Sequence, residues 1–327
     1  MQPGVPVTTS VEHYSAGVTL IMGPHWAADY SGERSFYSNA VFRDTFNQAF
    51  SLAGGQVYQD WTLKLLHTSE STEVPLVETG RQTQVHQHHT SLSAVDALGS
   101  DFRLELTGAQ FLRTAKGTPS SREWSGATWL DYRLAPTVDF GAGITAGFVD
   151  VRPGADLFYR TPQLRLAWRP RDSLQVKLTG GEEYCTFYGH VESQLQRPTY
   201  SGSIEYRPTR TTSLKLHHER EISIAVDSSQ VSENTREGIA LQQRVLGHFF
   251  LTASMERQEL HYLQPLLVLA GIAARHDMRQ TTSLRLTTTF RQRGTLSLVQ
   301  ERTHNDSNLA GYDFITNQSA FEIGYRF

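Results

Sequence analysis

Histidines and paired carboxylates are the residues of this chain whose types and spacing could do chemistry. His86 and His88 lie two positions apart, so their imidazoles would share one face of a strand and could hold a metal ion. His89 would face the other way, as would His217 relative to His218. No cysteine or carboxylate nearby completes a ligand set. We therefore interpret these histidines as solvated strand-end residues and expect neither a metal site nor a cofactor.

The carboxylate pairs Glu182-Glu183 and Glu219/Glu221 resemble acid and base pairs only superficially. The side chains of the adjacent Glu182 and Glu183 would point to opposite faces of a strand, and Glu219 and Glu221 lie in a segment rich in Lys and Arg. We therefore interpret both pairs as carboxylates that neutralise nearby Lys and Arg. The sequence contains no G-x-S-x-G, H-E-x-x-H, phosphate-loop or dinucleotide motif. A Ser-His-Asp set assembled in space stays open. We nevertheless expect no enzyme.

Charge and cysteine content narrow the function classes further. Lys and Arg number 30 against 33 Asp and Glu, a net charge of −3 that gives no reason to expect a nucleic-acid partner. The single Cys185 rules out an intramolecular disulfide and every cysteine-based zinc motif. No apolar run approaches the roughly 18 residues of a membrane-spanning helix. The elements that position the histidines and carboxylates are therefore not membrane-spanning helices.

Those elements are segments in which polar and apolar residues alternate, the signature of a transmembrane β-barrel. Their length, 10 or more residues in most cases, suits tilted strands that cross a bilayer, which need roughly 9–11 residues. An even number of strands suits a closed antiparallel barrel. We predict sixteen, approximately at residues 12–26, 40–52, 57–68, 83–97, 102–112, 124–134, 137–149, 157–168, 173–185, 199–206, 212–224, 236–245, 248–261, 277–290, 295–304 and 317–327.

The segments between these strands alternate in length. Tight turns such as Gly54-Gly55 and Ala135-Pro136 alternate with longer polar connections such as 30–39 and 69–82. Short turns on one rim and long loops on the other are typical of outer-membrane barrels. With sixteen strands, both termini would lie on the short-turn, periplasmic rim. We expect residues 1–11 to form a periplasmic segment, without the features of a signal peptide, and residues 12–327 to form the barrel.

The two faces of the predicted wall differ in polarity. In 212–220, Leu214 and Leu216 share one face while Lys215 and Glu219 share the other, and we assign the apolar set to lipid and the charged set to the interior. Such charges must be hydrated or ion-paired, and sixteen strands leave room for water. The residues predicted to line this pore are Arg43, Lys64, Arg103, Glu105, Asp131, Arg133, Arg165, Lys177, Glu183, Lys215, Glu219, Arg244, Glu256, Arg285 and Glu322.

One stretch departs from the alternation. Residues 263–274 are mostly apolar but contain Pro265 and Gly271, which makes them too short and too interrupted for a membrane-spanning helix. Three interpretations stay open: an extension of the preceding strand, a packed loop, or a loop that folds into the pore.

The chain resembles outer-membrane barrels of the β-barrel porin-2 type, which are often associated with exopolysaccharide production. Two strand-turn-strand units carry the resemblance, Leu164–Val176 and Ile204–Leu216, each with an aromatic residue, then Arg-Pro, then Ser-Leu. The closing alternation ends in Tyr325 and Phe327, matching the terminal aromatic pattern that barrel-assembly machinery recognises. The resemblance implies a transport role and supplies no catalytic residues.

The favoured function is passive passage of a hydrophilic cargo, either small solutes or an exported polysaccharide, through the outer membrane of a Gram-negative bacterium. The expected partners are outer-membrane lipid, the barrel-assembly machinery and, in one variant, periplasmic or lumen-filling subunits. Two alternatives stay open. One is a structural barrel whose lumen is plugged by loops or by a partner, and the other is a lipid-modifying enzyme with a Ser/His pair on the lipid-facing wall.

Overall fold

A computed structural model of the 327-residue chain describes residues 10–75, 82–117, 119–153, 156–188, 194–224, 231–263, 266–268, 271–290, 294–309 and 312–325. Every regular element in these ranges is a β-strand. The same ranges contain no helix long and apolar enough to span a membrane.

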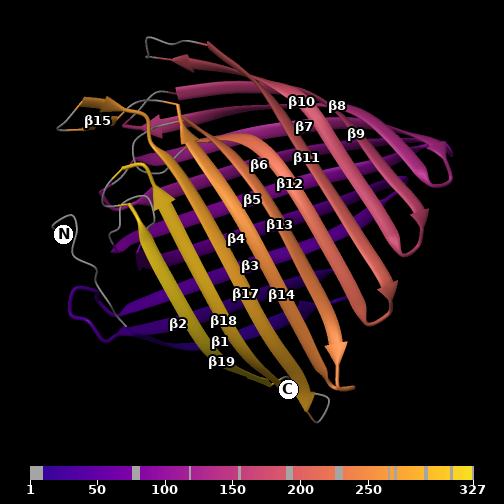
Figure 1. Ribbon diagram of the computed structural model, residues 1–327. Helices are drawn as coiled ribbons and strands as arrows, with labels where there is room; N and C mark the ends of the chain where they lie inside the picture. Colours follow the sequence, from indigo (N-terminus) through magenta and orange to yellow (C-terminus); the bar gives the residue numbers. More distant parts are fainter. Residues whose placement is uncertain are drawn as a thin grey trace.

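Seventeen strands form one antiparallel sheet that curls into a nearly closed barrel (Figure 1). Each strand pairs with the next along the chain, from β1 with β2 to β18 with β19, except that β14 pairs directly with β17. The strands of this sheet are β1 (Val11–Met22), β2 (Trp26–Tyr37), β3 (Thr45–Tyr58), β4 (Trp61–Pro75), β5 (Gln82–Leu98), β6 (Phe102–Ala115), β7 (Ser120–Ala135), β8 (Val138–Arg152), β9 (Asp156–Arg171), β10 (Leu174–Tyr188), β11 (Gln194–Thr209), β12 (Thr212–Ile224), β13 (Val231–Val245), β14 (Phe249–Tyr262), β17 (His276–Phe290), β18 (Gly294–Ser307) and β19 (Phe314–Tyr325).

The all-β antiparallel barrel is as predicted, but the strand count is not. The sequence interpretation took 12–26 as one strand and 30–39 as a connection, whereas β1 ends at Met22 and β2 occupies 26–37. The chain turns at residues 23–25, where Gly23 has a φ of +65°, a backbone conformation that favours glycine. The additional strand is β2, whose many small and polar residues obscure its alternation.

The additional strand changes the rim at which the first strand begins. Because seventeen is odd, β1 begins at the rim of the longer connections, where Val11 pairs with Tyr37, and β19 ends at the opposite rim (Figure 1). The first strand therefore begins and the last strand ends at opposite rims, whereas the sequence interpretation placed both at one rim. Among the described residues, no backbone pairing joins β1 to β19.

Gly54 and Gly55 form no turn, contrary to the sequence interpretation. Both lie inside β3, and the chain turns instead at Gln59-Asp60. A Cβ on Gly54 would overlap the Trp26 ring from β2, so this glycine makes room for a cross-strand indole. Glycine in a strand often marks such a close approach rather than a reversal of the chain.

Residues 263–274 are not an extension of β14. They contain a small separate hairpin, β15 (Leu266–Val268) with β16 (Gly271–Ala273), beyond the ends of β14 and β17 at the rim of the longer connections (Figure 1).

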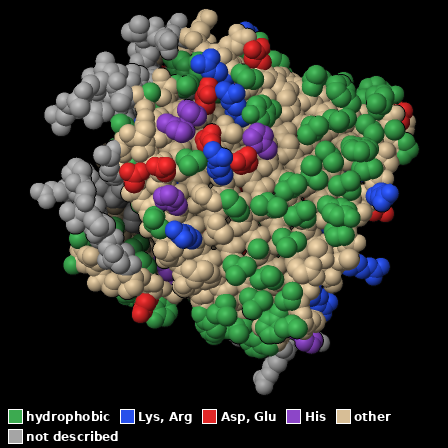
Figure 2. Space-filling view, viewed as in Figure 1, with side chains coloured by type: hydrophobic (Ala, Val, Ile, Leu, Met, Phe, Trp, Pro, Cys, Tyr) green, Lys and Arg blue, Asp and Glu red, His purple; other side chains and the backbone are tan. Residues whose placement is uncertain are grey.

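The outer face of the barrel is largely apolar and the inner face polar. Leu164 is 55% exposed and Leu284 47% exposed on the outer face, and Figure 2 shows a broad apolar area over the strands on the visible side. Charged and histidine side chains gather on that same side toward one rim (Figure 2). The only hydrophobic cluster of buried residues in the described ranges lies on the inner face and comprises Val149, Val151, Leu157 and Cys185.

Candidate functional site

The inner face carries an ion-pair group toward the rim of the short turns, built from side chains of β6, β7 and β9. Asp131 on β7, only 5% exposed, accepts hydrogen bonds from Arg103 on β6 (Nη2–Oδ2, 2.7 Å) and from Arg165 on β9 (Nε–Oδ1, 2.7 Å). Arg165 Nη2 also donates to Glu105 Oε2 on β6 at 2.8 Å. We call Arg103, Glu105, Asp131 and Arg165 the inner ion-pair group. Its two positive and two negative charges balance.

Two glycines of β8 create the space for this group. Gly141 lies opposite both Asp131 and Arg165 in the strand register, and a Cβ there would overlap the Asp131 carboxylate. A Cβ on Gly143 would overlap the Trp129 ring, over which the Arg165 guanidinium stacks at 4.3 Å from the ring centroid. The glycines of β8 thus leave room for the long side chain of Arg165 to reach over this strand to Asp131.

Further ion pairs follow the inner face. Asp139 on β8 lies 3.8 Å from Arg133 Nε and accepts a hydrogen bond from Arg169 Nη2 at 2.6 Å. Glu322 on β19 is paired with Arg285 on β17, with Nη1–Oε2 at 2.5 Å. Because one side of each pair remains partly exposed, these are hydrated pairs that contribute little to stability individually.

A cavity of about 660 Å³ opens on the inner face between the inner ion-pair group and the rim of the longer connections. Its lining includes the carboxylates Glu123, Glu183 and Glu221 and the hydroxyls of Tyr159 and Thr161. Tyr159 donates a hydrogen bond to Glu123 Oε1 at 2.5 Å, and Glu183 accepts one from the buried Cys185 Sγ at 3.4 Å. Such a surface offers many hydrogen-bond acceptors to a hydrated solute.

Sequence reasoning missed Glu123 and Tyr159. Glu123 lies before the predicted start of its strand at residue 124, whereas β7 begins at Ser120. The alternation does continue through Ser121, Glu123 and Ser125. Extending the predicted strand toward its N-terminus by a few residues would therefore have included Glu123. Tyr159 lay inside a predicted strand, but its aromatic ring gave no signal of a polar contact.

The other predicted inner residues fall into three groups. Lys64, Lys177 and Lys215 occupy inner-facing register positions and make no ion pair within the ranges described. Glu219 and Glu256 both contact Arg236, with nearest N–O distances of 3.1 and 3.6 Å. Arg244 donates to the Gly247 carbonyl at 2.6 Å beside a tight turn.

Arg43 is the exception among these predicted residues. β3 begins at Thr45, so Arg43 lies in the connection before it rather than on the wall. Its side chain is largely exposed and lies 3.5 Å from Glu73 at the rim.

Of the predicted assembly residues, Tyr325 pairs with Gly294 at the end of β19, and Phe327 lies outside the residues that the structure describes. A role for either in assembly stays a prediction.

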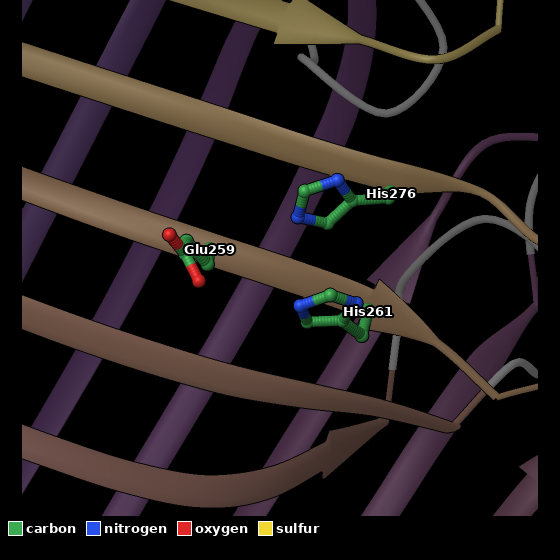
Figure 3. Close-up of side chains that lie close together, drawn as sticks. All are labelled: Glu259, His261 and His276. Carbon is green, nitrogen blue, oxygen red and sulfur yellow. The ribbon is translucent and has the colours of Figure 1, made fainter.

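The outer face holds a side-chain group that the sequence did not reveal. Glu259 and His261 on β14 and His276 on β17 place one ligand atom each within 4.8 Å of the others (Figure 3). The two imidazole rings stack with centroids 4.2 Å apart. The histidines are fifteen positions apart in the sequence, and only the strand register brings them together. By contrast, His86 and His88 belong to no group of three metal-ligating side chains among the described residues.

No family model matches this chain, and no curated protein matches it by sequence. The resemblance to the porin-2 type is therefore not confirmed. The fold, however, matches solved outer-membrane structures. The FrpB iron transporter of Neisseria meningitidis (F5-1 variant) aligns with a TM-score of 0.55 and 11% identity, over 91% of this chain and 62% of that one.

A second variant of the same transporter, F3-3, aligns with a TM-score of 0.52 and 10% identity, over 91% of this chain and 61% of that one. FpvA of P. aeruginosa, solved bound to an iron–pyoverdine complex, aligns with a TM-score of 0.51 and 7% identity, over 98% of this chain and 57% of that one. The chain thus spans about three fifths of the length of these proteins. Identities this low show that the barrel fold is shared and nothing more.

Proposed function

We propose that this protein is an outer-membrane channel that lets hydrophilic cargo pass without energy input. The observation that carries the proposal is the difference between the two faces of one continuous wall, which is apolar outside and lined inside by ion pairs, carboxylates and hydroxyls. Strands of 12 to 17 residues are long enough to cross a bilayer with tilt. The apolar outer face then contacts outer-membrane lipid, and the inner face contacts water.

The balance of charge inside suggests the class of cargo. The inner ion-pair group neutralises itself, and the pairs Arg285–Glu322 and Arg169–Asp139 do so as well. A pore selective for one ion sign would display a ring of one charge. We therefore favour neutral or zwitterionic hydrophilic cargo, including small sugars. Export of a polysaccharide, implied by the porin-2 resemblance, belongs to the same class of cargo.

The test is single-channel conductance of the purified, refolded protein in planar bilayers, combined with swelling of proteoliposomes in solutions of uncharged sugars. We expect steady conductance and swelling rates that fall as the sugar becomes larger. Insertion is verified independently by protection of the strands from protease in the vesicles. Protein that inserts fully but supports neither current nor swelling would show that the lumen is closed and would exclude passive passage.

A further inference from the structure

We propose that Glu259, His261 and His276 form a binding site for a divalent transition-metal ion on the outer face of the barrel. The site lies at the ends of β14 and β17, where the connection carrying the β15–β16 hairpin begins and ends (Figure 3). It is independent of the proposed channel, because these three side chains lie on the opposite face of the wall from the inner ion-pair group.

The strand register fixes the three residues on one face at short separation. His261 pairs directly with His276 across β14 and β17, and Glu259 precedes His261 by two residues on the same strand. Directly opposed residues of antiparallel strands have Cβ atoms about 4.5–5.5 Å apart, and residues i and i+2 share a face. Two opposed imidazoles with a carboxylate beside them can therefore converge on one ion by small side-chain rotations, without movement of the backbone.

His276 provides evidence that a ligand is missing. Its Nε2 atom is shielded from solvent yet has no hydrogen-bond partner in the described part of the chain. Leaving a buried polar atom without a partner is destabilising, so such atoms call for an explanation. The ring stacks on the exposed His261 ring, with an angle of 22° between the two planes. An ion shared between the two imidazoles would satisfy the unpaired nitrogen.

The inner side of the same strand ends holds the two histidines in place. Arg275, which precedes His276, is buried, forms an ion pair with Asp277, and lies 4.7 Å from the ring centroid of Tyr262 and 3.7 Å from that of Tyr312. Tyr262, which follows His261, donates a backbone hydrogen bond to the Arg275 carbonyl at 3.0 Å. The backbones of both histidines are thus fixed from behind.

A third backbone contact fixes the start of β17. Asn308 accepts a hydrogen bond from the His276 N–H on its side-chain oxygen at 2.8 Å, and it donates to the Ala274 carbonyl at 2.8 Å. Metal sites bind tightly when the surrounding structure orients the ligands in advance. Here the orientation comes from the backbone of β14, β17 and the residues after β18.

The donor set indicates the class of ion. Two imidazoles and one carboxylate suit Zn²⁺ and the neighbouring divalent transition metals, whereas Ca²⁺ and Mg²⁺ prefer oxygen ligands. Arg257 contacts Glu259 only through Oε1, which leaves Oε2 for the ion. Three protein ligands leave a coordination position for water, and the exposed His261 keeps that position accessible. A bound ion would link the two ends of the 263–275 connection.

The experiment measures Zn²⁺ binding to the refolded full chain in detergent, by equilibrium dialysis after treatment with a chelator. We expect one ion per barrel. In His261→Ala and Glu259→Gln, binding should weaken at least about tenfold, because loss of even a supporting partner costs about 10- to 100-fold in metal affinity. Both residues are on the outer surface, and unchanged circular dichroism and heat-dependent gel mobility would verify that the variants fold.

The matched control is the double variant His86→Ala/His88→Ala, which removes two histidines from β5 and should leave the affinity unchanged. The proposal is overturned if the parent binds no zinc, or if the control variant loses binding while His261→Ala and Glu259→Gln retain it. Neither result depends on conductance, so failure of this site and failure of the proposed channel are separate outcomes.

Discussion

The guanidinium of Arg165 reaches across β8 at Gly141 to the carboxylate of Asp131, with Nε–Oδ1 at 2.7 Å and Nη2–Oδ2 at 2.5 Å. The contact joins strands that are not neighbours in the sheet. It therefore depends on the absence of a side chain between them. This arrangement holds charges of both signs at fixed positions on the inner wall and leaves the barrel interior beside them open.

Gly141→Ala should destabilise the barrel, because the new methyl group would overlap the Asp131 carboxylate and lie 3.0 Å from Arg165 Cγ. Overpacking of this kind costs about 1–3 kcal/mol. The measurement is urea-induced unfolding in lipid vesicles. Gly108→Ala is the matched control, since nothing lies within 4 Å of its Cβ position. Equal unfolding midpoints in urea for the two variants would mean that the Arg165 side chain does not reach over β8 at Gly141.

Glu105→Gln should shift the channel toward anions. The substitution removes one negative charge from the balanced inner ion-pair group but leaves Asp131 bonded to both arginines. The measurement is the reversal potential across a bilayer in a KCl gradient. Glu237→Gln removes a carboxylate from the outer face, beside His218 and Arg257, and should leave the reversal potential unchanged. Equal shifts in both variants would contradict the assignment of Glu105 to the conducting face.

Adjacent residues on β17 test the assignment of the two faces. Leu284 is exposed on the outer face, and its neighbour Ser283 points inward. Leu284→Arg should cost about 2–4 kcal/mol of stability in a bilayer or prevent assembly, whereas Ser283→Arg should be tolerated in a hydrated interior. Both variants are compared by folding yield into vesicles. If Ser283→Arg is the more damaging change, the faces are reversed.

Local pattern predicted most of the fold because a period of two is encoded residue by residue. The faces of Leu214 and Lys215, and of Leu284 and Arg285, can be assigned from their own polarity, without knowledge of the neighbouring strands. The pattern failed where glycine has two uses. Gly23 turns the chain with a φ of +65°, whereas Gly54 makes room for Trp26. The sequence interpretation instead placed a turn at Gly54-Gly55 and continued one strand through residue 23. Continuing one strand through residue 23 accounts for the missed β2 and for the expectation that the first and last strands begin and end at the same rim.

The functional groupings could not be predicted to the same extent, because they depend on register between strands. Arg103, Asp131 and Arg165 lie on one face of the sheet, but nothing local in the sequence indicated that they converge. His261 and His276 are a more extreme case, since their pairing across β14 and β17 follows from the length of the connection between them. By contrast, His86 and His88 are close in sequence and drew attention for that reason alone.

The β15–β16 hairpin should not obstruct the channel. It is a separate two-stranded unit beyond the ends of β14 and β17, on the side of the longer connections (Figure 1). Replacing residues 266–273 with a Gly-Ser linker, while keeping Tyr262, Arg275 and both histidines, should therefore leave single-channel conductance unchanged. A silent parent with a conducting variant would mean that the connection gates or plugs the lumen. In that case regulated export would replace free diffusion as the proposed activity. The inner wall already carries balanced charges, so only the obstructing connection would prevent the parent protein from conducting.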